Sequence, residues 1–168
     1  MTTLRPFEEG DRAVMSELLL PYFEGIVARF VSVGGERLDP HEMVQKSLDD
    51  LPNATPPKGQ TFMAWSGAHC VGTGCLRKIS PTAGELKRMY VRPEAQGQGV
   101  GSALMAARFK LAAEMGLTDL YADTVYGNTN MLSLYARAGF TEIARYEGNA
   151  NPRHFAPFLT YLHKRISG

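Results

Sequence analysis

A run of glycines between a predicted strand and a predicted helix constrains this chain more than any other feature. Gln96-Gly97-Gln98-Gly99-Val100-Gly101 follows a predicted strand over 85–91 and precedes a predicted helix over 102–116. A glycine-rich turn at this point places bare backbone N–H groups at a helix N-terminus, where an anion binds readily. Glycine also lets the backbone approach a ligand closely. The pattern predicts an α/β fold that binds the pyrophosphate of a nucleotide-based cofactor.

The glycine spacing excludes two common nucleotide motifs. The dinucleotide fingerprint G-x-G-x-x-G fails from Gly97 and from Gly99, because Ser102 and Leu104 occupy the place of its last glycine. The phosphate-loop motif G-x-x-x-x-G-K-[ST] fails because no Lys-Ser or Lys-Thr follows the glycines. The alternative to an anion site is a plain strand-to-helix turn in which the glycines only reverse the chain.

Two longer motifs contain these glycines and a downstream tyrosine. Residues 91–101 read VRPEAQGQGVG, and residues 128–140 read NTNMLSLYARAGF. In this order they resemble the coenzyme A loop V-x-P-x-x-[RQ]-G-x-G-x-[GA] and the N-x-x-[AM]-x-x-L-Y-x-x-x-G-F motif of the GNAT superfamily, the acyl-CoA-dependent N-acyltransferases. The resemblance is strong from about residue 85 to residue 146 and weak before residue 60.

The resemblance implies acetyl-CoA as the cofactor. The loop would bind the pyrophosphate, and the main chain near Met89 and Val91 would pair with the pantetheine arm. Asn128 matches an asparagine that hydrogen-bonds this arm, although Asn128 or Asn130 could instead cap the following helix. Gln96 replaces an arginine that is frequent in the family, which keeps a donor and removes a charge. The predicted cofactor-binding residues are Met89, Tyr90, Val91, Gln96, Gly97, Gln98, Gly99, Val100, Gly101, Ser102, Asn128 and Asn130.

Two residues are the predicted catalytic groups. The resemblance places Tyr135 where the family has the tyrosine that protonates the departing thiolate, and a phenol with a pKa near 10 suits that task. Many family members have a glutamate at the position of Glu85, which could act as general base. The alternatives are a core aromatic for Tyr135 and a salt-bridged strand residue for Glu85. Regular alternation would place Glu85 and Met89, with Lys87 and Val91, on one face of the strand.

The acceptor side is less well specified. By the resemblance, the early helices and the loops after the last strands border the acceptor, so Phe23, Phe30, Tyr126 and Tyr146 are candidates for its pocket, each with a core role as the alternative. The polar tract 145–154 could contact an acidic or amino-acid-like substrate or be a solvated loop. The predicted reaction is direct acetyl transfer to a primary amine of a small molecule. The alternatives are a protein N-terminus or lysine as acceptor, and a non-catalytic CoA-binding module.

The remaining pattern predicts one domain over residues 1–168. The predicted fold is an α/β sandwich with a mixed, mostly antiparallel central sheet, GNAT-like in its order β-α-α-β-β-β-α-β-α-β-β. The predicted elements outside the two motifs are strands at 2–7, 61–65, 70–79, 120–125, 140–146 and 158–164, helices at 12–30, 40–51 and 130–138, and a break or kink in the first helix at Pro21 and Gly25.

Composition excludes several other classes of function. A net charge of +1 gives no reason to expect nucleic acid or an anionic membrane as a partner. No apolar run approaches the roughly 18 residues that span a bilayer, and the N-terminus lacks the apolar core of a signal peptide, so a cytoplasmic location is expected. Cys70 and Cys75 are predicted to be reduced and buried, and the four histidines show no metal-ligand spacing. Homodimers are common in the resembled family.

Overall fold

The computed structural model describes residues 1–166 and contains one seven-stranded sheet. The strands lie in the order β1-β2-β3-β4-β5-β7-β6, and only the β4–β5 pair is parallel. The strands are β1 (Thr2–Pro6), β2 (Gly59–Ser66), β3 (His69–Lys78), β4 (Ala83–Val91), β5 (Asp119–Val125), β6 (Thr141–Ile143) and β7 (Leu159–Arg165). The α-helices are α1 (Arg12–Ser32), α2 (Pro40–Asp49), α3 (Val100–Glu114) and α4 (Thr129–Arg137). Short 3-10 turns are η1 (Glu9–Asp11), η2 (Leu51–Ala54), η3 (Pro93–Ala95) and η4 (Arg153–Phe158).

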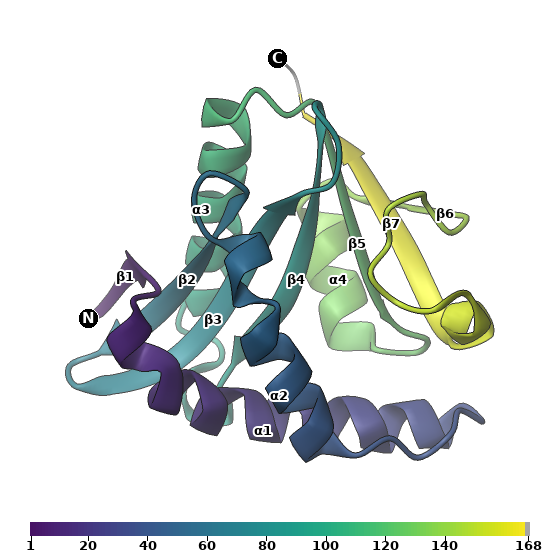
Figure 1. Ribbon diagram of the computed structural model, residues 1–168, viewed down its shortest axis with the longest axis horizontal. Coiled ribbons are helices and arrows are strands. Elements are labelled where there is room, and N and C mark those ends of the chain that lie inside the picture. Colours follow the sequence, from purple (N-terminus) through teal and green to yellow (C-terminus); the bar gives the residue numbers. More distant parts are fainter. Residues whose placement is uncertain (167–168) are drawn as a thin grey trace.

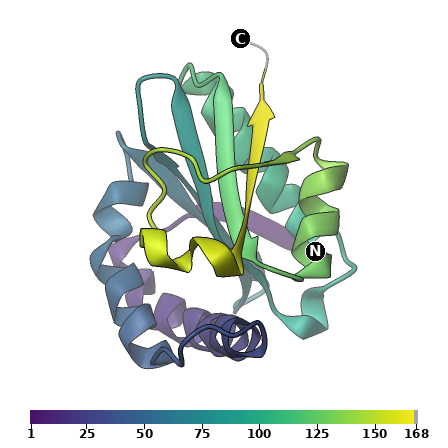
Figure 2. The same cartoon turned by 90° about the vertical axis from the view of Figure 1, so that its right-hand side faces the viewer.

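Helices cover both faces of the sheet. Helices α1 and α2 lie together on one face, and α3 and α4 pack on the other (Figures 1 and 2). The element order confirms the predicted β-α-α-β-β-β-α-β-α-β-β arrangement. In the described part of the chain, no helix is both long and apolar enough to cross a membrane.

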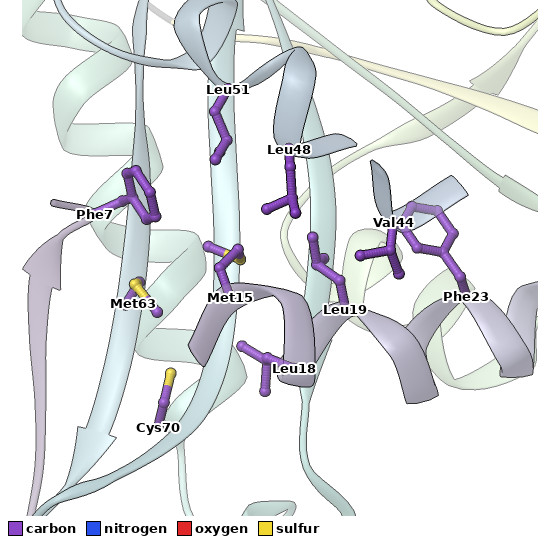
Figure 3. Close-up of a cluster of buried hydrophobic side chains, with 10 residues drawn as sticks. All are labelled: Phe7, Met15, Leu18, Leu19, Phe23, Val44, Leu48, Leu51, Met63 and Cys70. Atoms are coloured by element: carbon purple, nitrogen blue, oxygen red, sulfur yellow. The ribbon is translucent and has the colours of Figure 1, made fainter. Parts of the chain in front are cut away.

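The core on the α1–α2 side fixes these helices to β2 and β3. Met15, Leu18 and Leu19 of α1 pack with Leu48 of α2 and with Met63 of β2 (Figure 3). Their spacing along α1 is the i, i+3, i+4 pattern of a helix that buries one stripe. Burial of a leucine or methionine side chain contributes roughly 1.5–3 kcal/mol. This layer therefore holds α1 and α2 in fixed positions beside the central strands.

Of the two alternatives predicted for the first helix, a break is wrong, because α1 runs without interruption from Arg12 to Ser32 with Pro21 inside it. A kink at this position stays a prediction. Proline removes one helical hydrogen bond and crowds the preceding turn. Buried residues lie on both sides of Pro21, including Leu18, Phe23 and Phe30. Packing of these side chains against the rest of the protein offsets the local cost, so tertiary contacts override the local signal.

Strands β4 and β5 separate after a short paired segment. Their parallel pairing covers only Ala83–Asp119, Gly84–Leu120 and Glu85–Tyr121, while β4 continues to Val91 and β5 to Val125. Figure 1 shows the two ribbons close together at one end and spread at the other, with α4 seen between them. Beyond Glu85, the backbone groups of β4 that face β5 have no strand partner. Such an edge can pair with an extended ligand.

A bulge in β4 corrects the predicted alternation of its side chains. Thr73 pairs with Tyr90 and Cys75 pairs with Lys87, so β4 has one more residue than β3 across this interval. Arg88 has a positive φ of 53°, which is uncommon for a residue other than glycine. The extra residue reverses the faces beyond it. Met89 therefore packs with the α3 side and Tyr90 with the α1 side, so Met89 and Val91 do not share a face with Lys87 as predicted.

Two predicted boundaries also change. Helix α3 begins at Val100 instead of Ser102, because Gly99 forms its N-cap and leaves Val100 free to pack in the core. The strand predicted over 140–146 is limited to Thr141–Ile143, and residues 144–152 form a loop that folds back over β4 and β5.

Shortening Leu19 should destabilise the protein. Leu19 is fully buried, so Leu19→Ala removes buried methyl groups and leaves a cavity between α1 and the sheet. The expected loss is about 2–5 kcal/mol in the free energy of unfolding, measured by urea denaturation. Glu17→Ala, at an exposed site on the same helix, is the matched control and should change stability by about 0.5 kcal/mol or less. Equal effects of the two substitutions would contradict the packing of α1 described above.

Candidate functional site

A cleft of about 1240 Å³ opens where β4 and β5 separate. The glycine loop and helix α4 line one end of it. Helices α1 and α2 and the segment 150–159 line the other end. The floor consists of the divergent parts of β4 and β5, including Lys87–Val91 and Asp123–Val125. The cleft is therefore continuous from a loop suited to anions to a region bounded by helices and aromatic side chains.

The glycine loop has the conformation that an anion site requires. Gly97 and Gly99 both have positive φ values, of 74° and 82°, and Gly99 is the N-cap of α3. The first N–H groups of a helix have no partner within the helix, so those of α3 are available to a ligand. Gly101 lies against the end of Met89, where a β-carbon would come within 3.4 Å of the methionine Cε atom. These features fit a pyrophosphate at the start of α3.

The side chains around the glycines support the loop itself. Gln96 Nε2 donates to the Val91 carbonyl oxygen at 3.1 Å, and Gln98 Nε2 donates to the Glu94 carbonyl oxygen at 2.9 Å. Gln96, Gly97 and Gly101 line the cleft, whereas Val100 is buried in the core. The amide of Gln96 therefore ties the loop to the end of β4, a role that the sequence alone did not indicate.

The structure brings Asn128 and Asn130 to the same cleft as the glycine loop. Asn128 occupies the N-cap position of α4, but its side chain does not cap the helix and donates instead to Thr124 Oγ1 at 3.0 Å. Asn130 lies in the first turn of α4 and also lines the cleft. Met89, Tyr90 and Val91 border the cleft from β4. The predicted cofactor residues on β4 and α4 thus face one another across it.

Tyr135 lies on α4 at the boundary between the core and the cleft. It is 2% exposed, packs edge-on against Phe140 at 5.0 Å between ring centroids, and is among the cleft-lining residues. Burial raises the pKa of Tyr135 above its usual value of 10, and the positive charge of Arg108 opposes this effect. The burial of Tyr135 fits the core-aromatic alternative, and its place in the cleft lining is compatible with the predicted role as general acid. With its pKa raised, Tyr135 holds its proton at neutral pH.

Glu85 is 1% exposed and is not among the residues that line the cleft. Its Oε1 atom accepts from Arg77 Nε at 2.8 Å, and its Oε2 atom accepts from the Tyr146 hydroxyl at 2.6 Å. Oε2 also accepts from Asn149 Nδ2 at 3.3 Å and from the Ala150 N–H at 3.4 Å. The carboxylate is thus paired and hydrogen-bonded on both oxygens, as a buried charge requires.

Asp123 is a cleft-lining carboxylate that the sequence analysis missed. It lies on β5, where its Oδ2 atom accepts from Asn149 Nδ2 at 2.6 Å and from Asn151 Nδ2 at 2.9 Å. It forms no ion pair with a described lysine, arginine or histidine. Loss of solvent raises the pKa of Asp123, the Asn149 hydrogen bond lowers it, and the nearby charge of Glu85 raises it further. The sequence did contain a feature that could have identified Asp123 as a site residue. A carboxylate near the carboxyl end of a parallel strand lies where ligands bind in open α/β sheets.

Asn149 links the two carboxylates. Its Nδ2 group donates to both Glu85 and Asp123, and its main-chain carbonyl oxygen accepts from Arg145 Nη2 at 3.4 Å. Arg145 Nη2 also donates to the Asn151 carbonyl oxygen at 3.0 Å. Asn149 and Asn151 of the polar tract after β6 therefore cover the acidic floor of the cleft, while Glu147, Gly148 and residues 152–154 are exposed, as predicted for a solvated loop.

The four predicted acceptor residues have different surroundings. Phe30 lines the cleft and packs edge-on against Phe155 and Phe158, at 4.9 and 5.0 Å between centroids. Phe23 lines the cleft but is also part of the α1–α2 core. Tyr126 is 63% exposed and lies outside the cleft lining, and Tyr146 lies behind the cleft as a partner of Glu85. The structure therefore brings two of the four to the cleft.

The charged groups at the helical end of the cleft include one ion pair, and the carboxylates of Asp39 and Glu42 also line this end without an ion pair among the described residues. Arg88 Nη2, on the bulge, donates to Asp50 Oδ2 at 2.6 Å, which connects β4 to the end of α2. Lys46, Lys87 and Arg29 contribute further positive charge to the cleft lining. Among the described residues, no group of three or more His, Cys, Asp or Glu side chains is arranged to hold a metal ion.

Two relatives of this chain have names that describe them as acetyltransferases. It is 44% identical over 61 residues to a mycothiol acetyltransferase of Pseudarthrobacter chlorophenolicus, which covers 36% of this chain and 19% of that protein. It is 25% identical over 153 residues to an uncharacterized N-acetyltransferase of Schizosaccharomyces pombe, which covers 89% of this chain and 93% of that protein. The matched region thus spans only about a fifth of the mycothiol enzyme.

Solved structures and a family model agree with these relatives. A GNAT-family acetyltransferase from Staphylococcus aureus superposes with a TM-score of 0.82 at 16% identity, covering 99% of this chain and 100% of that one. The PaiA N-acetyltransferase of Thermoplasma acidophilum, solved in complex with coenzyme A, superposes with a TM-score of 0.77 at 15% identity, covering 99% of each chain. The model of the acetyltransferase (GNAT) family matches residues 14–140. This chain is therefore a member of the GNAT acetyltransferase family.

Proposed function

We propose that this protein transfers an acetyl group from acetyl-CoA to a primary amine of a small molecule by direct attack. One observation carries the proposal: a single cleft brings together the glycine loop, the divergent edge of β4, the phenol of Tyr135 and the unpaired carboxylate of Asp123. Acetyl-CoA, the cofactor of the GNAT family, supplies the activated acetyl thioester when bound.

The chain offers a complete set of groups for holding this cofactor. The N–H groups at the start of α3 bind the pyrophosphate, helped by the helix dipole, which contributes roughly 0.3–1 kcal/mol for an anion. The unpaired backbone edge of β4 around Met89 and Val91 pairs with the pantetheine arm, and Asn128 and Asn130 border it from α4. A backbone N–H near Met89 or Tyr90 polarises the reacting carbonyl group, as an oxyanion-hole donor does.

Tyr135 acts as the general acid. It holds its proton at neutral pH because burial raises its pKa. A leaving alkyl thiolate, whose parent thiol has a pKa near 8.5, takes a proton from a phenol in direct contact. The proton moves from the Tyr135 hydroxyl to the departing sulfur as the carbon–sulfur bond breaks and the carbon–nitrogen bond forms.

Asp123 binds the ammonium form of the acceptor and removes its proton. At pH 7 only about one alkylammonium molecule in a few thousand is a free amine, so a base near the reacting nitrogen is needed. A carboxylate with a raised pKa and no cationic partner suits both tasks. Glu85, the base predicted from the sequence, has an indirect role: it accepts a hydrogen bond from Asn149 and so helps to hold Asn149 against Asp123.

A small molecule is the favoured acceptor because helices and aromatic side chains border the far end of the cleft. Helices α1 and α2 border it, and the packed rings of Phe30, Phe155 and Phe158 lie between α1 and the C-terminal segment. The cations at this end are Arg29 on α1, Lys46 on α2, and Lys87 and Arg88 on β4. An acceptor that carries a carboxylate or another acidic group is compatible with them. An amino-acid-like compound carries both charges that the cleft can bind.

The direct test is release of free thiol from acetyl-CoA in the presence of amines. The panel consists of amino acids and their analogues, polyamines, aminoglycosides and short peptides. We expect release with one small-molecule class, strongest for amino-acid-like compounds. Release with peptides alone would replace the small-molecule acceptor by a protein one. Binding of CoA in calorimetry without release for any amine would favour the non-catalytic module, and no binding of CoA would overturn the assignment of the glycine loop.

Tyr135→Phe should lower kcat well over tenfold and leave the affinity for acetyl-CoA nearly unchanged. The substitution removes only the hydroxyl that donates the proton, while general acid catalysis contributes roughly 10²–10⁴-fold. Steady-state kinetics and calorimetry measure the two quantities. Tyr121→Phe is the matched control, because Tyr121 lies on β5 stacked against Tyr146 and His163, outside the cleft lining. Unchanged turnover in Tyr135→Phe would remove this residue from the mechanism.

Asp123→Asn should reduce activity and at the same time preserve or raise stability at pH 7. The folded state raises the pKa of Asp123 above 3.8, so the ionised carboxylate costs stability once the pH exceeds the folded pKa. The amide oxygen of asparagine can still accept from Asn149 and Asn151. In urea denaturation, any gain in stability should shrink as the pH falls toward 3.8, while kcat/KM should drop roughly 10²–10⁴-fold.

Asp119→Asn is the matched control for this experiment. Asp119 is also on β5, but its carboxylate is bound to His163 at 2.8 Å and lies outside the cleft lining, so activity should be unaffected. The Asp119 pKa is lowered, chiefly by the His163 hydrogen bond, so its loss should reduce stability at pH 7. An Asp123→Asn variant with full activity would exclude Asp123 as base and anchor.

A further inference from the structure

The most unusual buried group outside the cleft lining is Arg108 on α3. Its side chain is 0% exposed and forms no ion pair among the described residues. Nε donates to the Leu104 carbonyl oxygen at 3.2 Å, and Nη2 contacts the sulfur atoms of Met89 at 3.2 Å and Met105 at 3.7 Å. Nη1 has no hydrogen-bond partner in the part of the chain that the structure describes.

This arrangement is costly for stability alone. A buried charge ordinarily has a charged partner, and a guanidinium does not lose its proton in proteins. Thioether sulfurs are only weak acceptors. An apolar residue of similar volume would fill the same place without these costs. The presence of an unpaired cation there points to a role other than packing.

The surrounding backbone leaves room for the guanidinium. Gly74 of β3 lies opposite the β4 bulge, and a β-carbon at Gly74 would come within 3.2 Å of the Arg108 Cζ and Nε atoms. Met89, which follows the bulge, supplies one of the sulfur contacts. The bulge and the glycine together form the pocket that holds the cation behind the cleft.

Tyr135 is the group through which this cation can act. Arg108 Nη2 contacts the sulfur atom of Met105, and Met105 and Tyr135 belong to the same buried cluster between the sheet and helices α3 and α4. Arg108 Nη2 also contacts Met89, which lines the cleft together with Tyr135. The influence of Arg108 opposes the effect of burial and lowers the pKa of the phenol.

We propose that Arg108 is a positioning residue for proton transfer: its buried charge orients the Tyr135 hydroxyl and stabilises the phenolate that remains when the proton leaves. The O–H bond of Tyr135 breaks, the proton goes to the departing sulfur, and the positive charge of the guanidinium stabilises the negative charge left on the phenol oxygen. This proposal rests on the proposed function, because it assigns Arg108 to the acid step of that reaction.

Two substitutions separate charge from packing. Arg108→Met keeps most of the volume without the charge, and Arg108→Lys keeps the charge. We expect Arg108→Met to lower kcat roughly 10²-fold, by analogy with removal of one preorganised electrostatic group, with the affinity for CoA unchanged in calorimetry. Its Tm should be equal to or above that of the unmodified protein. Arg108→Lys should recover part of kcat. Lys110→Met, two residues along α3 at an exposed site, is the matched control and should leave both quantities unchanged.

Two further measurements test whether Arg108 acts through Tyr135. In the Tyr135→Phe background, Arg108→Met should cause no further loss of kcat, since interacting residues are not additive. In protein labelled at the Cζ atom of tyrosine, the Tyr135 resonance, identified by its absence in Tyr135→Phe, should shift in Arg108→Met and not in Lys110→Met.

The outcomes distinguish this proposal from the proposed function. A lowered Tm together with an unshifted Tyr135 resonance in Arg108→Met would assign Arg108 to packing and overturn the positioning role, as would an equal loss of kcat in both backgrounds. If the unmodified protein releases no thiol with any amine, the proposed function fails and so does the acid step. The resonance shift then still decides whether the two side chains are coupled, because it is measured without substrate.

Discussion

The early end of the β4–β5 pairing is the constraint on which the site depends. Three parallel residue pairs join the two strands, and beyond Glu85 and Tyr121 the strands diverge. Backbone groups that would be satisfied in a continuous sheet are left at the edge of β4, and a cleft forms between the two halves. The halves stay in place because helices pack across them on each face. A continuous sheet of the same strands would have no room for a cofactor between them.

The charged groups in and near the site differ in how completely they are paired. Glu85 is held on both oxygens by Arg77, Tyr146 and the loop after β6, whereas Asp123 receives only two amide donors. On the opposite side of the sheet, Arg108 is buried without a carboxylate. Glu85, which is fully paired, stabilises the fold around the site. We assign chemical roles to Asp123 and Arg108, which are incompletely paired. Stability given up at such positions is characteristic of functional sites.

Local patterns made the fold and the cofactor side of the site predictable. The glycine loop and Tyr135 lie in contiguous motifs, and the order of the elements follows from local patterns along the chain. Each could therefore be predicted without knowledge of distant contacts. The bulge at Arg88 left no such signal, because the residue with positive φ is not a glycine. The unbroken helix through Pro21 was missed because its stability comes from tertiary packing.

Asp123 and Arg108 show two further limits of sequence reasoning. The setting of Asp123 depends on asparagines 26 and 28 residues away, which only the fold brings near it. Arg108 did have a signal that was not used. It follows Leu104 and precedes Ala112 at intervals of four residues, so a charged residue stood on the buried face of the helix. The contacts of Arg108 with Met89 could still not be predicted, because the two residues lie on different elements.

The ring cluster of Phe30, Phe155 and Phe158 joins the first long helix to the last segment of the chain. Neither segment contributes a strand to the β4–β5 fork or a residue to the glycine loop. Under the proposed function, the wall that an acceptor would meet is built from segments other than those that would hold the pyrophosphate. Substitutions restricted to these three rings would then change the choice of amine and leave the pyrophosphate site as it is.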